Sequence, residues 1–476
     1  MATYPDVAGV ILAAGVGKRL KSRTPKALHP FLGRPLLVHA LETIAPLELH
    51  PTVVVVSPVI QERLKADNLL GDRDVRLALQ ENPRGTADAL RAALSSLADE
   101  ATSHVLVTPC DAPLLTTETL ARLGRAHLNS GASATLLTAN LADPTGYGRV
   151  IRADGESIAS IVEEADADAS QKRITEINAG SYVFELGRLR TLLDKVDHEN
   201  AQDEYYLTDV VALLRADGGS VMAVMGSEQE ARGVNDRAQL AAAAAGKRRE
   251  ICEHWMAEGV TIVHPDSTFI DASVRIGRDT VIQPFTFLQG DTTIGEGVQI
   301  GPQAQIVDSQ IEDGAQISYA VIRGSSIGPA ATVGPFASLR PGTRLEKGAR
   351  IGTFVETKQT TIGEESKANH LSYLGDAEIG RGVNVGAGTI TCNWDGVEKH
   401  KTVIEDEAYI SSDTMLVAPV HIGKKAATGA GAVVKGDVPD GALAVGVPAR
   451  VLEGKGDRMK GRTRDKASET PDDAAQ

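Results

Sequence analysis

Small residues followed by cations come directly after the first apolar run of the chain. The run Val7–Leu12 is typical of a strand, and the segment LAAGVGKRL occupies positions 12–20. Open parallel sheets bind ligands at the carboxyl ends of their strands, where successive backbone N–H groups can hold phosphate oxygens. The segment is not a P-loop, because Arg19 stands where Ser or Thr is needed, and Leu20 replaces the third Gly of the dinucleotide fingerprint. Two interpretations of the segment remain. It is either a loop that holds a base and phosphates, with Lys26 nearby, or simply a tight strand–helix turn.

Other strand ends carry polar groups that fit the same chemistry. Gln80 and the pair Gly85-Thr86 lie between an expected strand and an expected helix, and Asp111 ends the strand that begins at residue 104. An Asp at this position is often only a helix cap or a turn former. Together with the amide oxygen of Asn235, however, its carboxylate suits a hydrated Mg²⁺ shared with phosphates. We therefore predict a magnesium–nucleotide site at this sheet edge.

A second group of chemically capable residues lies in the C-terminal half. Arg340 and Lys358 are 18 residues apart, and Tyr373 and His370 follow. In a six-residue repeat with three strands per coil, residues 18 apart stack on one face. Two stacked, unpaired cations are unfavourable without an anion between them, so we predict a phosphate site. An imidazole with a pKa near 6.5 suits general base catalysis beside it, although a purely structural His is the simpler alternative.

Strand and helix patterns alternate along the first 234 residues. Strands are expected over 7–12, 52–57 and 104–108, and helices over 35–44, 86–97 and 116–129. This alternation predicts an α/β nucleotide-binding (Rossmann-like) domain, with a mainly parallel sheet covered by helices on both faces. The Ala-rich segment Asn235–Gly259 contains no Pro and predicts one long linker helix.

From about Asp266 onward, aliphatic residues recur every six positions. The first series is Ile270, Ile276, Ile282, Leu288, Ile294, Ile300 and Ile306, and the period resumes from Ile327 and from Ile404. Neither a helix nor an alternating sheet has this period, which is typical of a parallel β-helix of hexapeptide repeats. Thr357–Ile362 and Thr391–Thr402 are interpreted as insertions, which in solenoids form loops, often on the binding face.

Composition excludes several classes of protein. The chain has 476 residues, with 49 Lys and Arg against 63 Asp and Glu, a net charge of −14 that argues against a general nucleic-acid binder. Three scattered cysteines do not form a disulfide framework or a zinc cluster. No signal peptide and no apolar run long enough for a membrane are expected, so a cytoplasmic protein without membrane or nucleic-acid partners is predicted. The predicted boundaries are 1–234, the linker helix 235–259, the β-helix 260–453 and a disordered tail 454–476.

These motifs resemble known families. LAAGxGxR followed by Pro-Lys, Gln, Gly-Thr and a strand-end Asp is similar to the sugar-1-phosphate nucleotidyltransferases. Joined to a repeat domain with KANHLSYLGDAEIG and NVGAGTITCNWDG, residues 7–450 resemble the bacterial GlmU family, which fuses a uridyltransferase to an acetyltransferase. The resemblance implies a left-handed β-helix, a homotrimer, Mg²⁺, and UTP and acetyl-CoA as co-substrates. It also implies glucosamine 1-phosphate and N-acetylglucosamine 1-phosphate as the acceptors.

The resemblance assigns residues to the first site. Those implied to contact UTP or the UDP-sugar are Leu12, Ala13, Ala14, Gly15, Arg19, Lys26, Gln80, Gly85, Thr86, Pro109, Cys110, Asp111, Gly148, Glu163, Asn178 and Asn235. Asp111 and Asn235 would also ligate Mg²⁺. Relatives usually have Gly where Cys110 stands, and we expect its side chain to tighten the pocket or to expose it to thiol reagents.

The resemblance also assigns the second site, with His370 as the general base. The residues implied to hold the acceptor sugar phosphate are Arg340, Lys358, Tyr373 and Asn384, and those implied to contact acetyl-CoA are Ala387, Asn393, Trp394, Ser412 and Ala430. Val447 stands where relatives often carry an Arg that contacts coenzyme A.

Three other functions are weighed against this one. A monofunctional nucleotidyltransferase with a regulatory β-helix would not need His370 beside Arg340 and Lys358. A non-catalytic scaffold would not need Lys26 and Asp111. A zinc enzyme on the same β-helix would use histidines, but His264, His370, His400 and His421 lack close ligand spacing.

Overall fold

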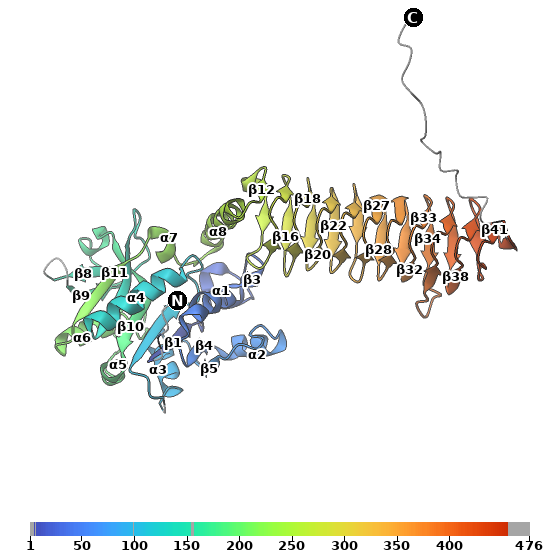
Figure 1. The fold of residues 1–476 in the computed structure, drawn as a ribbon. Helices are drawn as coiled ribbons and strands as arrows, with labels where there is room; N and C mark the ends of the chain where they lie inside the picture. The colour runs from blue at the N-terminus through green and yellow to red at the C-terminus, as the bar shows by residue number, and fades with distance from the viewer. Residues whose placement is uncertain (1–3, 5, 99, 154–156, 456–476) are drawn as a thin grey trace, which may run out of the picture. The chain divides into compact units, whose positions relative to one another are not determined.

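The computed structural model describes residues 4, 6–98, 100–153 and 157–455, and the chain forms two compact units that divide between Lys247 and Arg248 (Figure 1). From residue 456 on, the predicted tail lies outside the described residues. Among the residues that are described, no helix combines the length and the apolarity needed to cross a membrane.

A mixed nine-stranded sheet forms the centre of the first unit, with the order β11-β7-β10-β6-β1-β4-β5, and β8 and β9 added beside β10. Its strands are β1 (Val7–Leu12), β4 (Thr52–Val56), β5 (Arg76–Leu79), β6 (His104–Pro109), β7 (Ala134–Asn140), β8 (Arg149–Arg152), β9 (Ile158–Val162), β10 (Glu176–Glu185) and β11 (Val221–Met225). The strands β6, β1, β4 and β5 run parallel, as predicted, whereas β10 runs antiparallel to both of its neighbours, β6 and β7.

Helices cover both faces of this sheet because successive side chains of each strand point to opposite faces. In β1, Ala8 and Val10 pack in one apolar cluster, and Val7 and Ile11 pack in the other. The first cluster receives α3 (Thr86–Ser95), α5 (Leu186–Leu193) and α6 (Asp209–Ala216). The second receives α1 (Leu36–Ile44), α2 (Pro58–Ala66) and α4 (Thr117–Ser130). The three helices expected from sequence lie within two residues of their predicted bounds.

The predicted linker helix is α8 (Arg237–Ala257), which follows the short helix α7 (Glu228–Ala231). The two compact units divide within α8. Its first half belongs to the first unit, where Ala243 packs with Phe31 and Val234. In the second unit, Cys252 is fully buried at the start of the β-helix core.

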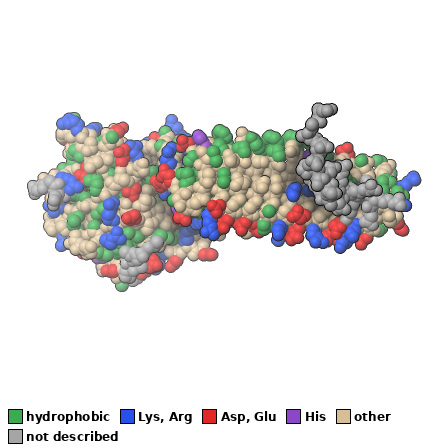
Figure 2. All heavy atoms as spheres, turned by 45° about the horizontal axis from the view of Figure 1, so that its top comes forward, with side chains coloured by type: hydrophobic (Ala, Val, Ile, Leu, Met, Phe, Trp, Pro, Cys, Tyr) green, Lys and Arg blue, Asp and Glu red, His purple; other side chains and the backbone are tan. Residues whose placement is uncertain are grey.

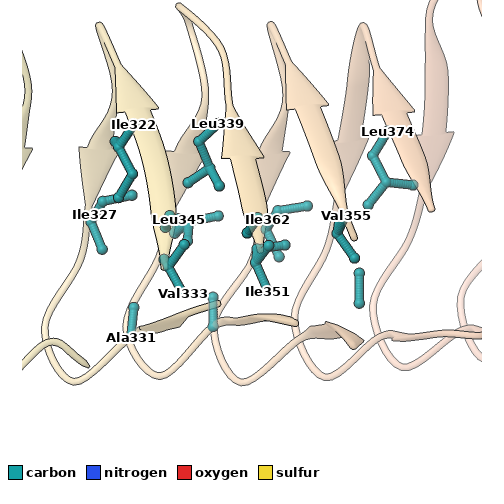
Figure 3. Packing of buried hydrophobic residues seen from close by; sticks show 14 of the residues in the cluster. Ile322, Ile327, Ala331, Val333, Leu339, Leu345, Ile351, Val355, Ile362 and Leu374 are labelled. Atoms are coloured by element: carbon teal, nitrogen blue, oxygen red, sulfur yellow. The ribbon is translucent and has the colours of Figure 1, made fainter. Parts of the chain in front are cut away.

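The second unit is a parallel β-helix with three faces, as the hexapeptide period predicts. Over the described residues, the first face has twelve strands from β12 (Thr261–Ile262) to β42 (Ala449–Leu452). The second face has ten, from β13 (Phe269–Ile270) to β40 (Val433–Val434), and the third has nine, from β14 (Arg275–Ile276) to β38 (Val420–Ile422). Most coils point one aliphatic side chain per face into a continuous apolar core, as Figure 3 shows for Ile322, Leu339 and Leu374.

The structure corrects one of the two predicted insertions. Thr357 and Ile362 both point inward, and the strands that carry them, β28 (Glu356–Lys358) and β29 (Thr361–Ile362), are consecutive. The segment is therefore a five-residue step, one residue shorter than the repeat, and not a loop. The second predicted insertion is real: a loop leaves the second face after β34 (Ile390–Cys392) and returns at β35 (Thr402–Ile404).

Candidate active sites

The residues predicted for the first site meet at the carboxyl edge of the parallel strands. Leu12 ends β1 and pairs in register with Pro109, the last residue of β6. The next backbone N–H, that of Cys110, donates to the carbonyl of Leu12 at 3.1 Å, and that of Gln80 donates to the carbonyl of Val56 at 2.9 Å. The loop after β1, the residue after β5 and the residues after β6 therefore share one edge.

The loop after β1 combines buried small residues with exposed backbone. Ala13 and Ala14 are buried, whereas Gly15 and Arg19 are exposed, and a Cβ at Gly15 would meet nothing within 4 Å. Gly17 has φ +68°, and a Cβ there would lie 2.6 Å from the Cβ of Lys26. Only glycine permits both this conformation and the close approach of Lys26. The loop thus leaves an open backbone surface with a lysine held against it.

Lys26 joins the two predicted metal ligands. Its ammonium donates to the amide oxygen of Asn235 at 2.9 Å and forms an ion pair with the carboxylate of Asp111. The backbone N–H of Val234 donates to the carbonyl of Asp111 at 2.8 Å, which fixes Asn235 beside the strand end. A cation already lies between a carboxylate and an amide oxygen, so the donor set fits Mg²⁺. Since the described residues contain no group of three His, Cys, Asp or Glu able to hold a metal, phosphates and water would supply the remaining ligands.

A second group of residues at this sheet edge consists of Gln80, Gly85 and Thr86. The Gln80 side chain is buried, and its amide donates to Asp88 Oδ2 at 2.8 Å and to the carbonyl of Gly85 at 3.2 Å. Gly85 has φ +123°, and a Cβ there would lie 2.4 Å from the carbonyl oxygen of Tyr205. The segment around Tyr205, which the sequence did not reveal, therefore packs directly on the predicted nucleotide loop.

Gly148, Glu163 and Asn178 come together beside β8, β9 and β10. The backbone N–H of Asn178 donates to the carbonyl of Gly148 at 2.9 Å, and a Cβ at Gly148 would lie 3.3 Å from both carboxylate oxygens of Glu163. Burial raises the pKa of Glu163, and a hydrogen bond of 3.0 Å donated by the Thr208 hydroxyl opposes this shift. Thr208 was missed from sequence, because it lies 45 residues from Glu163 and follows no motif.

The structure corrects the expectation that Cys110 opens the site to thiol reagents. Its side chain is only 6 % exposed and packs in the apolar cluster beneath the sheet. Burial raises the pKa of the thiol to about 12, so it is neutral at physiological pH. Because the thiolate is the nucleophilic form, Cys110 is a packing residue beside Asp111.

In the second unit, the predicted cations stack on the second face. Ser338 pairs with Glu356 and Leu339 with Thr357, so Arg340 and Lys358 occupy equivalent positions of adjacent coils. The prediction that both are unpaired is wrong for Arg340, which binds Glu356 Oε1 at 2.9 Å.

A third cation, Lys399 on the inserted loop, contacts Lys358, and its ammonium lowers the pKa of the Lys358 side chain. A nearby Arg340 lowers it further, and Asp376 opposes the shift. Three cations therefore converge on one patch, and this convergence gives the patch affinity for a multiply charged anion.

Tyr373 and Asn393 border this patch. A Cβ at Gly375 would lie 2.4 Å from the Tyr373 hydroxyl and 2.7 Å from the Asn393 amide nitrogen. Glycine at position 375 therefore leaves room for the side chain of Tyr373 to lie across the second face of the β-helix. Asn393 is 8 % exposed, and its amide donates to the Tyr373 hydroxyl at 3.5 Å and to the carboxylate of Asp376.

His370 heads a column of residues at the corner between the first and second faces. Ala368 pairs with Val385, and Val385 pairs with Ile410. In the next coil Tyr409 pairs with Ala427, which places Thr428 opposite Ile410. The residues two positions further along in each coil are His370, Ala387, Ser412 and Ala430. His370 and Ser412 are exposed, and small side chains follow the imidazole for three coils. The predicted base and three of the residues predicted to contact coenzyme A therefore lie in one column.

Two predicted contacts lie elsewhere. Asn384 is in β33 (Asn384–Val385) of the first face, paired with Lys367 and Tyr409, whereas Tyr373 lies on the second face. Trp394 is on the inserted loop and is 56 % exposed.

A nucleotide-type loop on an α/β sheet, followed by a β-helix with a separate cationic patch, defines a two-domain transferase. Comparison with known proteins agrees with this class. Residues 9–180 match the MobA-like NTP transferase domain, and residues 273–307 match the bacterial transferase hexapeptide repeat.

Relatives align along nearly the whole chain. The chain is 48 % identical over 465 residues to the bifunctional protein GlmU of Thermobifida fusca, covering 97 % of this chain and 96 % of the relative. It is 49 % identical to that of Mycolicibacterium vanbaalenii over 94 % of this chain and 92 % of the relative. For that of Caldanaerobacter subterraneus the identity is 45 %, over 92 % and 95 %. The chain belongs to the GlmU family of bifunctional proteins.

Proposed function

We propose that the protein makes UDP-N-acetylglucosamine in two steps, acetyl transfer in residues 260–453 and uridylyl transfer in residues 1–234. The observation that supports this proposal is the presence of two separate groups of charged side chains that could each bind an anion. One surrounds Lys26, Asp111 and Asn235, and the other surrounds Arg340, Lys358 and Lys399. A monofunctional nucleotidyltransferase would use only the first of these sites.

In the acetyl transfer, the three cations hold the phosphate of glucosamine 1-phosphate. The phosphate and the amine are on adjacent sugar carbons, and Tyr373 lies between the cations and the corner that carries His370. The amine attacks the thioester carbonyl of acetyl-CoA, and the thiolate of coenzyme A leaves. His370 Nε2 or Nδ1 accepts the proton that the nitrogen loses, a role that an exposed imidazole can fill.

In the uridylyl transfer, a phosphate oxygen of N-acetylglucosamine 1-phosphate attacks the α-phosphorus of UTP and pyrophosphate leaves. The attacking oxygen is already ionised, so no general base is needed. Gly148, Glu163 and Asn178 orient the sugar, and the loop 12–15 with Gln80, Gly85 and Thr86 orients the nucleotide. A Mg²⁺ held by Asp111 and Asn235 would neutralise charge on the triphosphate, and Lys26 and Arg19 add fixed positive charge.

We also propose a homotrimer formed through the β-helix. Phe336, Phe354 and Leu371 occupy one corner of successive coils and are 54 %, 58 % and 59 % exposed. Figure 2 shows hydrophobic side chains gathered along an edge of the β-helix. Exposed apolar stripes of this kind mark protein interfaces. Leu371 adjoins His370, so a neighbouring subunit at this corner would complete the site with residues such as Asn384 and Trp394.

The test is product analysis after incubation with glucosamine 1-phosphate, acetyl-CoA, UTP and Mg²⁺, with each component omitted in turn. UDP-N-acetylglucosamine should form only with all four, and N-acetylglucosamine 1-phosphate should accumulate without UTP. Formation of a UDP-sugar without acetyl-CoA would instead support the monofunctional alternative. We expect the protein in the cytoplasm, where UTP and acetyl-CoA are available.

A further inference from the structure

A carboxylate lies beside the cationic patch of the second unit, which is unexpected at a site for a phosphate. Asp376 follows β31 (Tyr373–Gly375) at the corner between the second and third faces, with φ +49°. It lies close enough to Lys358 to raise the pKa of that side chain against the opposing effect of Lys399. Its negative charge weakens anion binding, so its presence requires another reason.

The contacts of Asp376 supply that reason, because they reach both ends of the inserted loop. Its carboxylate accepts a hydrogen bond from the amide of Asn393, where the loop begins. Its backbone carbonyl accepts one from the N–H of Thr402 at 3.1 Å, where the loop ends. Its own N–H donates to the carbonyl of Lys358 at 2.9 Å, so the same residue ties the loop to the coil that carries the cation.

The loop itself is a closed unit. Trp394 and Lys399 form an antiparallel bridge, and the N–H of His400 donates to the carbonyl of Asn393 at 2.8 Å. Asp395 and His400 pair at 2.6 Å across it. A loop closed in this way is held together by its own contacts, so its position is set by its attachments at the base. A further side-chain attachment, the ion pair between Lys401 and Glu378, is more than half exposed.

We propose that Asp376 is a positioning residue for acetyl transfer: it fixes the amide of Asn393 and the base of the loop that brings Lys399 to Lys358. This inference rests on the proposed acetyltransferase function of the same site. With its amide nitrogen committed to Asp376, Asn393 offers its carbonyl oxygen as an acceptor toward the substrate. The carboxylate acts through these groups and does not itself touch the acceptor.

The test compares Asp376→Ala with Asp376→Asn, which keeps an acceptor oxygen for the Asn393 amide. Asp376→Ala should raise the KM for glucosamine 1-phosphate and lower kcat, reducing kcat/KM by about 10- to 100-fold, as expected for the loss of a hydrogen bond to a charged group. The KM for acetyl-CoA should rise as well, because Asn393 and Trp394 are among the residues assigned to acetyl-CoA. Asp376→Asn should stay within about threefold of the parent enzyme.

A matched control separates this role from the stability of the corner. Asp308 occupies the same corner of an earlier coil, has φ +47°, and accepts a hydrogen bond from the N–H of Asp291 at 3.0 Å. Asp308→Ala makes the same change of residue in the same conformation, away from the loop. It should leave acetyl transfer unchanged, and uridylyl transfer should be unchanged in all three variants.

A second measurement follows the loop directly. The chain has two tryptophans, so in a Trp255→Phe background the fluorescence comes from Trp394 on the loop. Asp376→Ala should lower the emission anisotropy and increase quenching by acrylamide, and Asp376→Asn should not.

Equal losses in Asp376→Asn and Asp376→Ala, an equal loss in Asp308→Ala, or an unchanged anisotropy would each overturn the positioning role. Absence of acetyl transfer in the parent enzyme would instead refute the proposed function.

Discussion

Lys26 donates a hydrogen bond to the amide oxygen of Asn235 at 2.9 Å, although 209 residues separate the two in sequence. The same ammonium pairs with Asp111. The lysine therefore holds together the oxygens that we propose as ligands of Mg²⁺.

This relationship predicts the effect of removing the carboxylate. Asp111→Ala should lower uridylyl transfer by at least about 10²-fold, since fixed charge at a phosphoryl-transfer site contributes on this scale. Pyrophosphate release from UTP measures the loss. Acetylation of glucosamine 1-phosphate by the same preparation should be unchanged, and a parallel loss of both activities in a folded protein would contradict independent sites.

The opposite pattern is expected for the second site. His370→Ala should lower acetyl transfer by about 10²- to 10⁴-fold, the usual contribution of a general base. Release of free thiol from acetyl-CoA measures this step, with uridylyl transfer as the internal control. If acetyl transfer persists at the parental rate, another group must accept the proton.

The hydrogen bond from Thr208 to Glu163 predicts a pH effect. In the proposed site the ionised carboxylate of Glu163 binds the sugar. Because burial already raises the pKa of this carboxyl, the affinity should fall as the pH drops through that pKa. Thr208→Val removes the donor that stabilises the ionised form and should raise the pKa of Glu163 further. The KM for N-acetylglucosamine 1-phosphate should then begin to rise at a higher pH than in the parent enzyme.

Charged neighbours of Glu163 should reinforce this effect. Asp166, Glu204 and Asp209 all raise its pKa, and Tyr182 and Tyr206 lie near it. Thr208→Ser, which keeps the hydroxyl, is the matched control. A KM–pH profile that is the same in Thr208→Val and in the parent would show that the hydroxyl does not act on Glu163.

Two glycines with positive φ should differ in their tolerance of alanine. At Gly131, which ends α4 with φ +62°, a Cβ meets nothing within 4 Å, so Gly131→Ala should cost about 1 kcal/mol in the free energy of unfolding. At Gly85 the Cβ also clashes with the Tyr205 carbonyl, and the cost should reach about 3 kcal/mol. Denaturant titration measures both, and only Gly85→Ala should weaken UTP binding.

The apolar corner of the β-helix predicts a change of assembly. Phe354→Asp places a charge in the proposed interface and should convert the trimer to monomers, with loss of acetyl transfer. Val59→Asp in α2 changes a side chain that is equally exposed, at 58 %, and should leave the trimer intact. Light scattering gives the masses. A Phe354→Asp protein with the parental mass would place the interface elsewhere.

Periodic patterns were sufficient to predict both folds. Ile270, Ile282 and Leu288 are fully buried because a six-residue repeat returns the side chain to the interior once per face. Likewise, Asp111 and Gln80 could be placed at one sheet edge, because the carboxyl ends of parallel strands meet there. The stacking of Arg340 on Lys358 follows from the six-residue repeat, because the two residues are one coil apart.

Contacts that depend on loops needed the three-dimensional structure. Lys399 reaches Lys358, Thr208 reaches Glu163, and Tyr205 packs on Gly85, and none of these pairs follows a repeat or a motif. The six-residue repeat determines where a side chain points only as long as each residue has the same conformation as the equivalent residue of the preceding coil. Once the chain leaves the repeat, the path of a loop is decided by its attachments at the base, which come from distant parts of the sequence.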